Sequence, residues 1–358
     1  MTSDRATRIK EQLPAPVVAL ARPLVRGVVQ GVHRARQIVR MGRRGVYHWQ
    51  KEFFLRHRLA PWGEATFNVL ANARAPRDAY RRRLMARRFT ARHASVRLSG
   101  ETGHVLLDRH QLEGVDEVLR TCQQLFAAKV PSPGSMARDA DGKRGFLRNL
   151  LTNDDLQTHT ELVRFALSDQ LLAAATEYLG TIPHLNRVDL LYSVPRTGDT
   201  LEASQLFHLD PEGLRQVKLF LNVHDVGDPE GPFTFIPADA SRHLIQEIRA
   251  RRHREGVPVV GRYTDEEIGQ LGGTPSIVEV RGSAGTGVLV DTCRCLHCGS
   301  RVQAGAYRLC LYIQYCTSRE QGNVFDIQQF SDDPVRYLAV VRSRMSVGAR
   351  IAAPHQMS

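Results

Sequence analysis

The sequence lacks any hydrophobic run long enough to cross a membrane. Its longest apolar run near the start, APVVALA, is far shorter than the roughly 20 residues that a membrane-spanning helix requires. Charged residues precede this run and Pro23 follows it, which is not the pattern of a secretory signal. We therefore expect a soluble, cytoplasmic protein, either free or peripheral at a membrane.

Lysine is scarce throughout, and acidic side chains are scarce in the first hundred residues. The chain has 5 lysines against 44 arginines, and residues 1–100 carry 22 basic side chains against 5 acidic ones. This segment has a charge of +17 and the whole chain +12, so the remaining 258 residues sum to −5. Such a basic segment favours contact with an anionic surface, either lipid headgroups or nucleic acid. Its sparse aromatic residues form no clear nucleic-acid motif, so we expect membrane or partner docking.

Apolar residues in the basic segment recur at a spacing of four, at Leu20, Leu24, Val28 and Val32. This is the period of an amphipathic helix, which either lies on a membrane surface or packs on its own protein. The stretch DAYRRRLMARRF (78–89) has the same character. Residues 1–98 are therefore predicted to form a basic, mostly helical N-terminal extension.

Helical patterns give way to short strand-like runs after residue 99. The pattern predicts a strand, a turn and a helix over 103–128, and helices over 165–180 and 240–256. Strand-like runs bounded by turn residues lie at 187–194, 216–226, 232–237, 285–291 and 306–315. This order predicts an α+β fold with flanking helices and a jelly-roll or cupin-like core, that is, a double-stranded β-helix. We place this domain at 99–318, with 240–275 as a candidate lid and 319–358 as a C-terminal tail. Lys218 either lines the cavity of that core or is solvated.

The stretch SQLFHLDPEG places a histidine and an aspartate two positions apart, at His208 and Asp210. On a strand this spacing turns both side chains to one face. His297 is the best third ligand, because it follows the apolar run GVLVD and precedes another strand. Two histidines and one carboxylate hold Fe(II) and leave three positions open. Arg308 lies on the next strand, where a buried guanidinium needs an anion such as a dicarboxylic keto acid.

These residues resemble the phytanoyl-CoA dioxygenase-like branch of the iron(II)/2-oxoglutarate oxygenases. The resemblance covers about residues 100–318, including the QLFHLD box, NVHDVGDPEGPFTFIPADASRH, and LVDTCRCLHCGS leading to YRLCLYI. It implies that His208, Asp210 and His297 hold Fe(II). It also implies that Arg308 holds the tail of the co-substrate 2-oxoglutarate.

The same resemblance indicates two further co-substrate contacts, Gln205 and, more weakly, Ser300. It implies a dioxygenase that hydroxylates an unactivated C–H of a small organic or acyl substrate and releases succinate and CO2. Asp210 is retained, which disfavours halogenation. A small hydroxyl residue often follows the arginine by two positions in that family, whereas this chain has Cys310.

Two other interpretations stay open. Four candidate zinc ligands fall within six residues, although one hexapeptide is cramped for a tetrahedral site: Cys293, Cys295, His297 and Cys298. Otherwise, the six cysteines are expected to be free thiols. The second interpretation is a non-catalytic jelly roll whose basic N-terminal segment docks on a membrane or another anionic partner.

Overall fold

Two antiparallel sheets form the core of the computed structural model, which describes residues 76–93, 96–133, 145–196, 200–210, 212, 214–257, 261–270, 277–317 and 322–341. The strands of the larger sheet are β1 (His104–Leu107), β2 (Leu147–Asn149), β3 (His184–Ser193), β5 (Gln216–Asn222), β9 (Gly287–Val290) and β11 (Arg308–Cys316). Those of the smaller sheet are β4 (Phe207–His208), β6 (Thr234–Ile236), β7 (Arg262–Tyr263), β8 (Val278–Glu279) and β10 (Leu296–Cys298).

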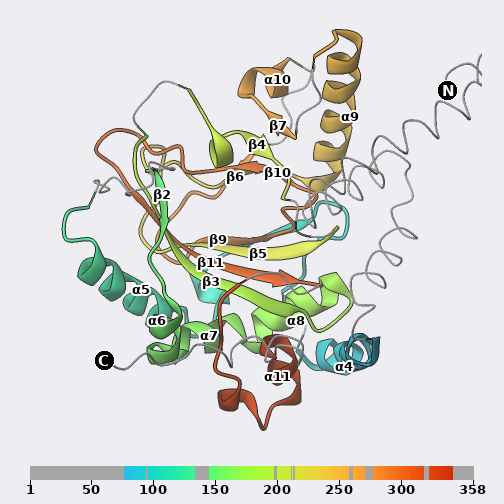
Figure 1. Cartoon of the computed structure of the whole chain (residues 1–358), viewed down its shortest axis with the longest axis vertical. Coiled ribbons are helices and arrows are strands. Elements are labelled where there is room, and N and C mark those ends of the chain that lie inside the picture. Colours follow the sequence, from blue (N-terminus) through green and yellow to red (C-terminus); the bar gives the residue numbers. More distant parts are fainter. Residues whose placement is uncertain are drawn as a thin grey trace, which may run out of the picture. The chain divides into compact units, whose positions relative to one another are not determined.

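The two sheets lie one above the other (Figure 1). Their strand orders are β1-β9-β5-β11-β3-β2 and β7-β4-β10-β6-β8. From β3 to β6 the chain changes sheet at every strand, and it does so again from β8 to β11. This alternation is the arrangement of a jelly roll, so the predicted α+β fold with a double-stranded β-helix core is confirmed.

Helices cover the outer faces of both sheets. Those near the six-stranded sheet are α4 (Pro76–His93), α5 (Val115–Lys129), α6 (Asn153–Thr158), α7 (Thr160–Ala166), α8 (Asp169–Leu179) and α11 (Pro334–Val340) (Figure 1). The five-stranded sheet carries α9 (Ala238–Arg254) and α10 (Asp265–Gly269), and short 3-10 turns lie at η1 (Arg109–Gln111), η2 (Ala203–Gln205) and η3 (Gln328–Phe330).

Strand alternation separates an apolar outer face of the large sheet from a mixed inner face. On β5, Leu219 and Leu221 join the main hydrophobic core under the helices, whereas Phe220 belongs to a small inner cluster. On β11, Leu311 packs outward and Tyr312 inward in the same way. Successive side chains of a strand point to opposite faces, so every second residue of β5 and β11 faces the smaller sheet.

The outer face of the small sheet is covered by α9 and α10. Phe207, Leu296 and Cys298 pack there with apolar residues of the two helices, among them Leu244 and Ile268. The predicted helix over 240–256 is thus confirmed as α9. It lies on the face opposite the inner cluster, and the lid role of 240–275 stays a prediction.

Helices also form on both sides of the predicted oxygenase domain, α4 before it and α11 after it. Helix α4, within the predicted extension 1–98, packs against α8 and α11. Its Arg82 is buried and donates to Asp78 Oδ2 at 2.9 Å and to the Leu338 carbonyl at 2.5 Å. Residues 1–75, with the helix predicted near residue 20, lie outside the described residues. None of the helices in the described ranges is long and apolar enough to cross a membrane.

Candidate metal centre

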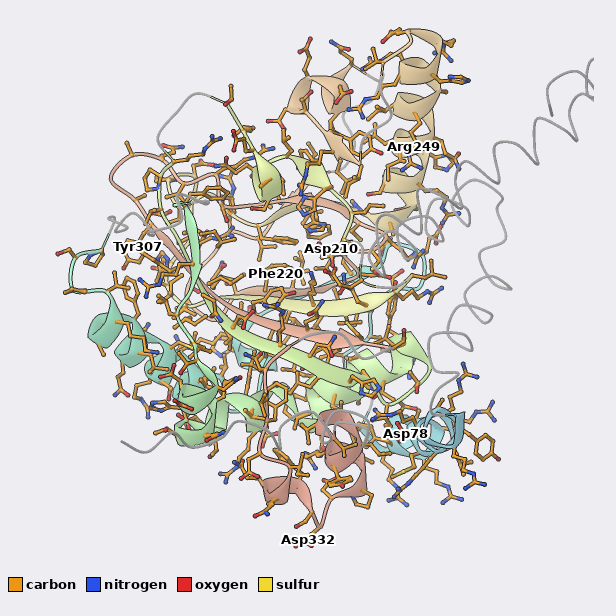
Figure 2. The ribbon with its side chains drawn as sticks, viewed as in Figure 1. Asp78, Asp210, Phe220, Arg249, Tyr307 and Asp332 are labelled. Atoms are coloured by element: carbon orange, nitrogen blue, oxygen red, sulfur yellow. The ribbon has the colours of Figure 1, made fainter. Side chains whose placement is uncertain are left out.

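The structure brings His208, Asp210 and His297 together on the inner face of the small sheet. His208 on β4 and His297 on β10 are paired in register, and their ring centroids lie 4.3 Å apart. Asp210 Oδ1 is 3.8 Å from His208 Nε2, and Asp210 Oδ2 is 3.4 Å from His297 Nε2. One ligand atom from each residue falls within 4.8 Å of the others. Figure 2 places Asp210 between the two sheets.

Asp210 reaches this cluster differently from the sequence prediction. Strand β4 ends at His208, so the two residues do not share one strand. The Asp210 amide instead donates to the Thr292 carbonyl at 2.9 Å, which fixes the loop after β4 against the segment leading to β10. A backbone contact over 82 positions of sequence thus sets the carboxylate in place.

The hydrogen bonds of the two imidazoles define which nitrogen is left for a ligand. Nδ1 of His208 lies 2.9 Å from the Leu206 carbonyl, and Nδ1 of His297 lies 3.0 Å from the Cys295 carbonyl. A carbonyl only accepts, so each Nδ1 carries the proton in the neutral ring. Each Nε2 lone pair then faces the centre, as in metal sites where the other ring nitrogen is held by a carbonyl.

The protonation states also suit a divalent cation. Burial lowers the pKa of His297 to about 3 and lowers the pKa of His208. Burial alone opposes ionisation of Asp210, but Lys218 and the two imidazoles hold the pKa of this carboxyl well below its usual range. Metal ligands must be neutral imidazoles and ionised carboxylates. The donor set therefore fits Fe(II) at neutral pH.

Arg308 is a buried guanidinium without an ionic partner among the described residues. It is 3% exposed, and its Nη1 donates to the Gly231 carbonyl at 2.7 Å. Its Nε has no hydrogen-bond partner in the described structure. Burial lowers its pKa, and the groups that oppose this are the thiols of Cys310 and Cys298 rather than a carboxylate. A buried cation of this kind calls for an anionic ligand.

Gln205 and Ser300 lie next to each other but are engaged in local structure. The Gln205 side chain donates to the Ser300 carbonyl at 3.0 Å, and the Ser300 hydroxyl lies 3.1 Å from that of Ser193. Ser300 has φ +60°, which only a tightly held non-glycine residue adopts. These contacts shape the loop after β10, and the co-substrate role of both residues stays a prediction.

The cysteine-rich hexapeptide does not form a zinc cluster. Among the described residues, the only group of three or more potential ligands that converges is the His208, Asp210, His297 set. On β10 His297 faces inward whereas Cys298 packs on the outer face with α9.

Lys218, which sequence reasoning left undecided, is a buried part of the centre. It is 6% exposed, and its Nζ lies 2.6 Å from Asp210 Oδ2. The signal was the alternation on β5, where Lys218 and Phe220 share the inner face. Gln216, two positions earlier on that face, reaches the same oxygen at 3.4 Å and was not anticipated.

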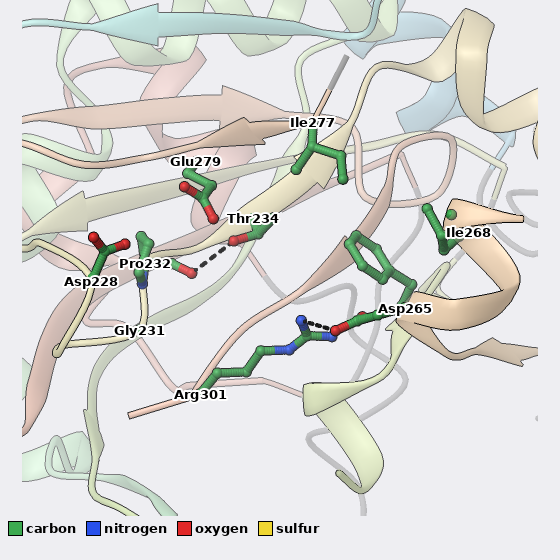
Figure 3. A pocket seen from close by; sticks show the side chains of 11 residues that line it. Asp228, Gly231, Pro232, Thr234, Asp265, Ile268, Ile277, Glu279 and Arg301 are labelled. Atoms are coloured by element: carbon green, nitrogen blue, oxygen red, sulfur yellow. Dashed lines mark hydrogen bonds and ion pairs between the residues drawn. The ribbon is translucent and has the colours of Figure 1, made fainter. Parts of the chain in front are cut away.

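A cavity of about 360 Å³ lies on the other side of the small sheet (Figure 3). Phe207, Thr234 and Glu279 line it. Each of them is next in sequence to a residue that faces the large sheet, so their side chains point to the outer face of the small sheet. Arg301 also lines the cavity and forms a two-point ion pair with Asp265 at 2.8–2.9 Å. This cavity is therefore separated from the metal centre by the sheet itself.

No family model matches the chain. No curated protein matches it either. Solved structures with a similar fold include the epimerase SnoN in complex with Fe3+, alpha ketoglutarate and nogalamycin RO, at 17% identity and TM-score 0.39, covering 65% of this chain and 84% of that one. EctD from S. alaskensis with 2-oxoglutarate and 5-hydroxyectoine has 15% identity and TM-score 0.41, covering 63% and 73%. The carbocyclase SnoK from nogalamycin biosynthesis has 18% identity and TM-score 0.36, covering 60% and 79%. Likeness at this level assigns no activity.

Proposed function

We propose that this chain is a non-haem Fe(II)- and 2-oxoglutarate-dependent dioxygenase of the phytanoyl-CoA dioxygenase-like type. It hydroxylates an unactivated C–H of a small organic or acyl substrate and releases succinate and CO2. The observation that carries this proposal is the pairing of two features inside one jelly roll. A His-Asp-His cluster has the donor atoms of a metal site, and the buried Arg308 has no anionic partner among the described residues.

His208, Asp210 and His297 would hold Fe(II), because their Nε2 and carboxylate atoms already converge in the required protonation states. When bound, the ferrous ion supplies the activation of dioxygen. Three protein ligands leave room at the ion for a co-substrate and for dioxygen. The protein's own part is to hold these donors rigidly, which the carbonyl contacts of both Nδ1 atoms achieve.

Arg308 would bind the distal carboxylate of 2-oxoglutarate. Its planar guanidinium can donate two parallel hydrogen bonds to a carboxylate, and its Nε is still unsatisfied. The backbone of Gly299 lies close to the guanidinium of Arg308. A Cβ added at Gly299 would be only 3.2 Å from Arg308 Nη2. A dianion bound here would also compensate the buried positive charge of Arg308, which has no carboxylate partner in the part of the chain that the structure describes.

Aromatic side chains pack between the two sheets beside the candidate metal centre. Phe220 stacks on Phe233 with ring centroids 3.9 Å apart, and Phe233 lies 5.6 Å from the His297 ring. Figure 2 shows Phe220 projecting from the large sheet towards the small one. These apolar side chains would exclude water from the centre and would suit contact with the hydrocarbon part of a substrate.

Succinate formation tests this proposal. The purified chain with Fe(II), dioxygen and 2-oxoglutarate should release succinate, measured across a panel of candidate substrates. His208→Ala and His297→Ala should abolish it, whereas His243→Ala, an exposed histidine on α9, should not. Equal succinate release by wild type and both ligand variants would refute the assignment.

We also propose that the basic N-terminal segment docks on anionic lipid. Helix α4 supports this, because Arg77, Arg81, Arg83, Arg87, Arg88 and Arg92 are all exposed on it. Tyr80 and Leu84, four positions apart on this helix, are 70% and 47% exposed. Arginines around exposed apolar side chains match the interfacial layer of a membrane.

A further inference from the structure

Lys218 presents a second cation to the carboxylate of the candidate metal centre. Its Nζ lies 2.6 Å from Asp210 Oδ2 and 5.2 Å from the centre of the Tyr312 ring. A buried ammonium is strongly disfavoured unless a charge compensates it. Asp210 provides that charge, so one carboxylate serves both a lysine and, under the proposed function, a metal ion.

This arrangement is unexpected for a residue that only fills space. The two histidine ligands are neutral, so Asp210 is the one negative charge among the three ligands. A lysine beside it repels a metal ion and weakens metal binding by simple electrostatics. A methionine of similar length would fill the same position on β5 without that repulsion.

Two side chains of β5 contact the same oxygen of Asp210, Oδ2, which also lies 3.4 Å from His297 Nε2, whereas Oδ1 lies 3.8 Å from His208 Nε2. Lys218 Nζ and Gln216 Nε2 both donate to Oδ2, at 2.6 and 3.4 Å. Gln216 is itself fixed, because its Nε2 also donates to Thr292 Oγ1 at 2.9 Å and its Oε1 accepts from Gln314 at 2.7 Å. The large sheet thus holds Oδ2 through a continuous network of buried polar groups.

We propose that Lys218 is a positioning residue that reserves Oδ2 of Asp210, so that the carboxylate offers Oδ1 to the metal. A carboxylate that is free to rotate can bind a cation through both oxygens and occupy one more position. By holding Oδ2, Lys218 keeps that position open for co-substrate or dioxygen. This inference rests on the proposed function, since it concerns the same metal centre.

Mn2+ binding to the metal-free full chain tests the inference without using activity. Lys218→Met removes both the charge and the donor, so it should bind Mn2+ at least tenfold more tightly than wild type. The number of exchangeable waters on the bound ion, measured by water-proton relaxation, should fall by about one. Asn222→Ala on the same strand, whose side chain donates to the Val280 carbonyl, is the matched control and should change neither value.

Lys218→Gln separates the charge from the hydrogen bond. It removes the charge but keeps a donor for Oδ2, so affinity should rise while the water count stays at the wild-type value. In an Asp210→Asn background, Lys218→Met should still remove the repulsion of the ion but should no longer change the water count, because the carboxylate that the lysine holds is gone. If Lys218→Met fails to fold, the affinity of Lys218→Gln still tests the electrostatic part of the inference.

Unchanged or weaker Mn2+ affinity together with an unchanged water count in the Lys218 variants would overturn the positioning role. The proposed function fails separately, namely if the expected Mn2+ results appear and no substrate gives succinate. Absence of Mn2+ binding by wild type would overturn both.

Discussion

Replacing Arg308 by methionine should separate co-substrate binding from folding and from metal binding. The side chain is 3% exposed, its Nε lacks a partner in the described structure, and burial lowers its pKa. Methionine keeps most of the volume and removes the unpaired charge. Without 2-oxoglutarate, the variant should therefore be at least as stable as wild type, since removing an uncompensated buried charge does not destabilise a fold.

The expected loss of 2-oxoglutarate affinity is large. Removing one partner of a buried, hydrogen-bonded charge pair costs about 2–5 kcal/mol, which corresponds to a roughly 30- to 4,000-fold higher Kd. Fe(II) affinity should stay within about threefold of wild type, because Arg308 contacts Gly231 and no metal ligand in the described contacts. Anaerobic calorimetry with Fe(II) and then 2-oxoglutarate measures both values on one sample.

Arg252→Met provides the matched control. Arg252 is a buried arginine as well, but it forms a two-point ion pair with Glu267 at 2.7 Å. Its replacement should lower the free energy of unfolding by about 2 kcal/mol and leave 2-oxoglutarate affinity unchanged. Wild-type co-substrate affinity in Arg308→Met would refute the reasoning, as would equal losses in the two variants.

Three other predictions concern stability and docking. Burial raises the pKa of Asp291 from 3.8 to about 6, so between those pH values only the folded state holds the proton and stability falls as pH rises. Relative to Asp291→Asn, wild type should therefore lose about 2.4 kcal/mol between pH 4 and pH 7 in urea unfolding, and a constant difference would contradict this. A Cβ on Gly231, which has φ +66°, would lie 2.5 Å from the Arg301 carbonyl carbon. Gly231→Ala should thus lower the melting temperature well below that of Gly305→Ala, where φ is +83° but the space is open; equal shifts would refute the steric argument. The full chain should bind anionic but not neutral vesicles, and a Tyr80→Ser/Leu84→Ser variant should bind more weakly; equal binding to both vesicle types would exclude lipid docking.

Strand periodicity predicted the parts of the fold that depend on local pattern. The runs 216–226 and 306–315 alternate between core and inner face, and the structure contains β5 and β11 there. The helix predicted over 165–180 corresponds to α8 from Asp169 onward, whereas its first two residues belong to α7. Helix α8 ends at Gly180, which has φ +67° as a helix stop requires. Two-residue strands such as β4 and β7 have too few positions to show any period, so no sequence pattern announces them.

The candidate site was predictable as a set of residues but not as a geometry. The three ligands were named from spacing and strand context, whereas the position of Asp210 depends on a hydrogen bond to Thr292, remote in sequence. The pairing of Lys218 with Asp210 likewise depends on how the two sheets face each other. Alternation along a single strand showed only that Lys218 lay on the inner face. Which acid it meets is decided by tertiary structure.

The central claim is that His208, Asp210 and His297 form one ferrous ion site. Anaerobic Fe(II) titration of the metal-free full chain, followed by calorimetry, tests it most directly. Wild type and His243→Ala should bind one ion per chain, and this binding should be lost in His208→Ala, Asp210→Ala and His297→Ala. Undiminished binding in the three ligand variants, or no binding by wild type, would contradict it.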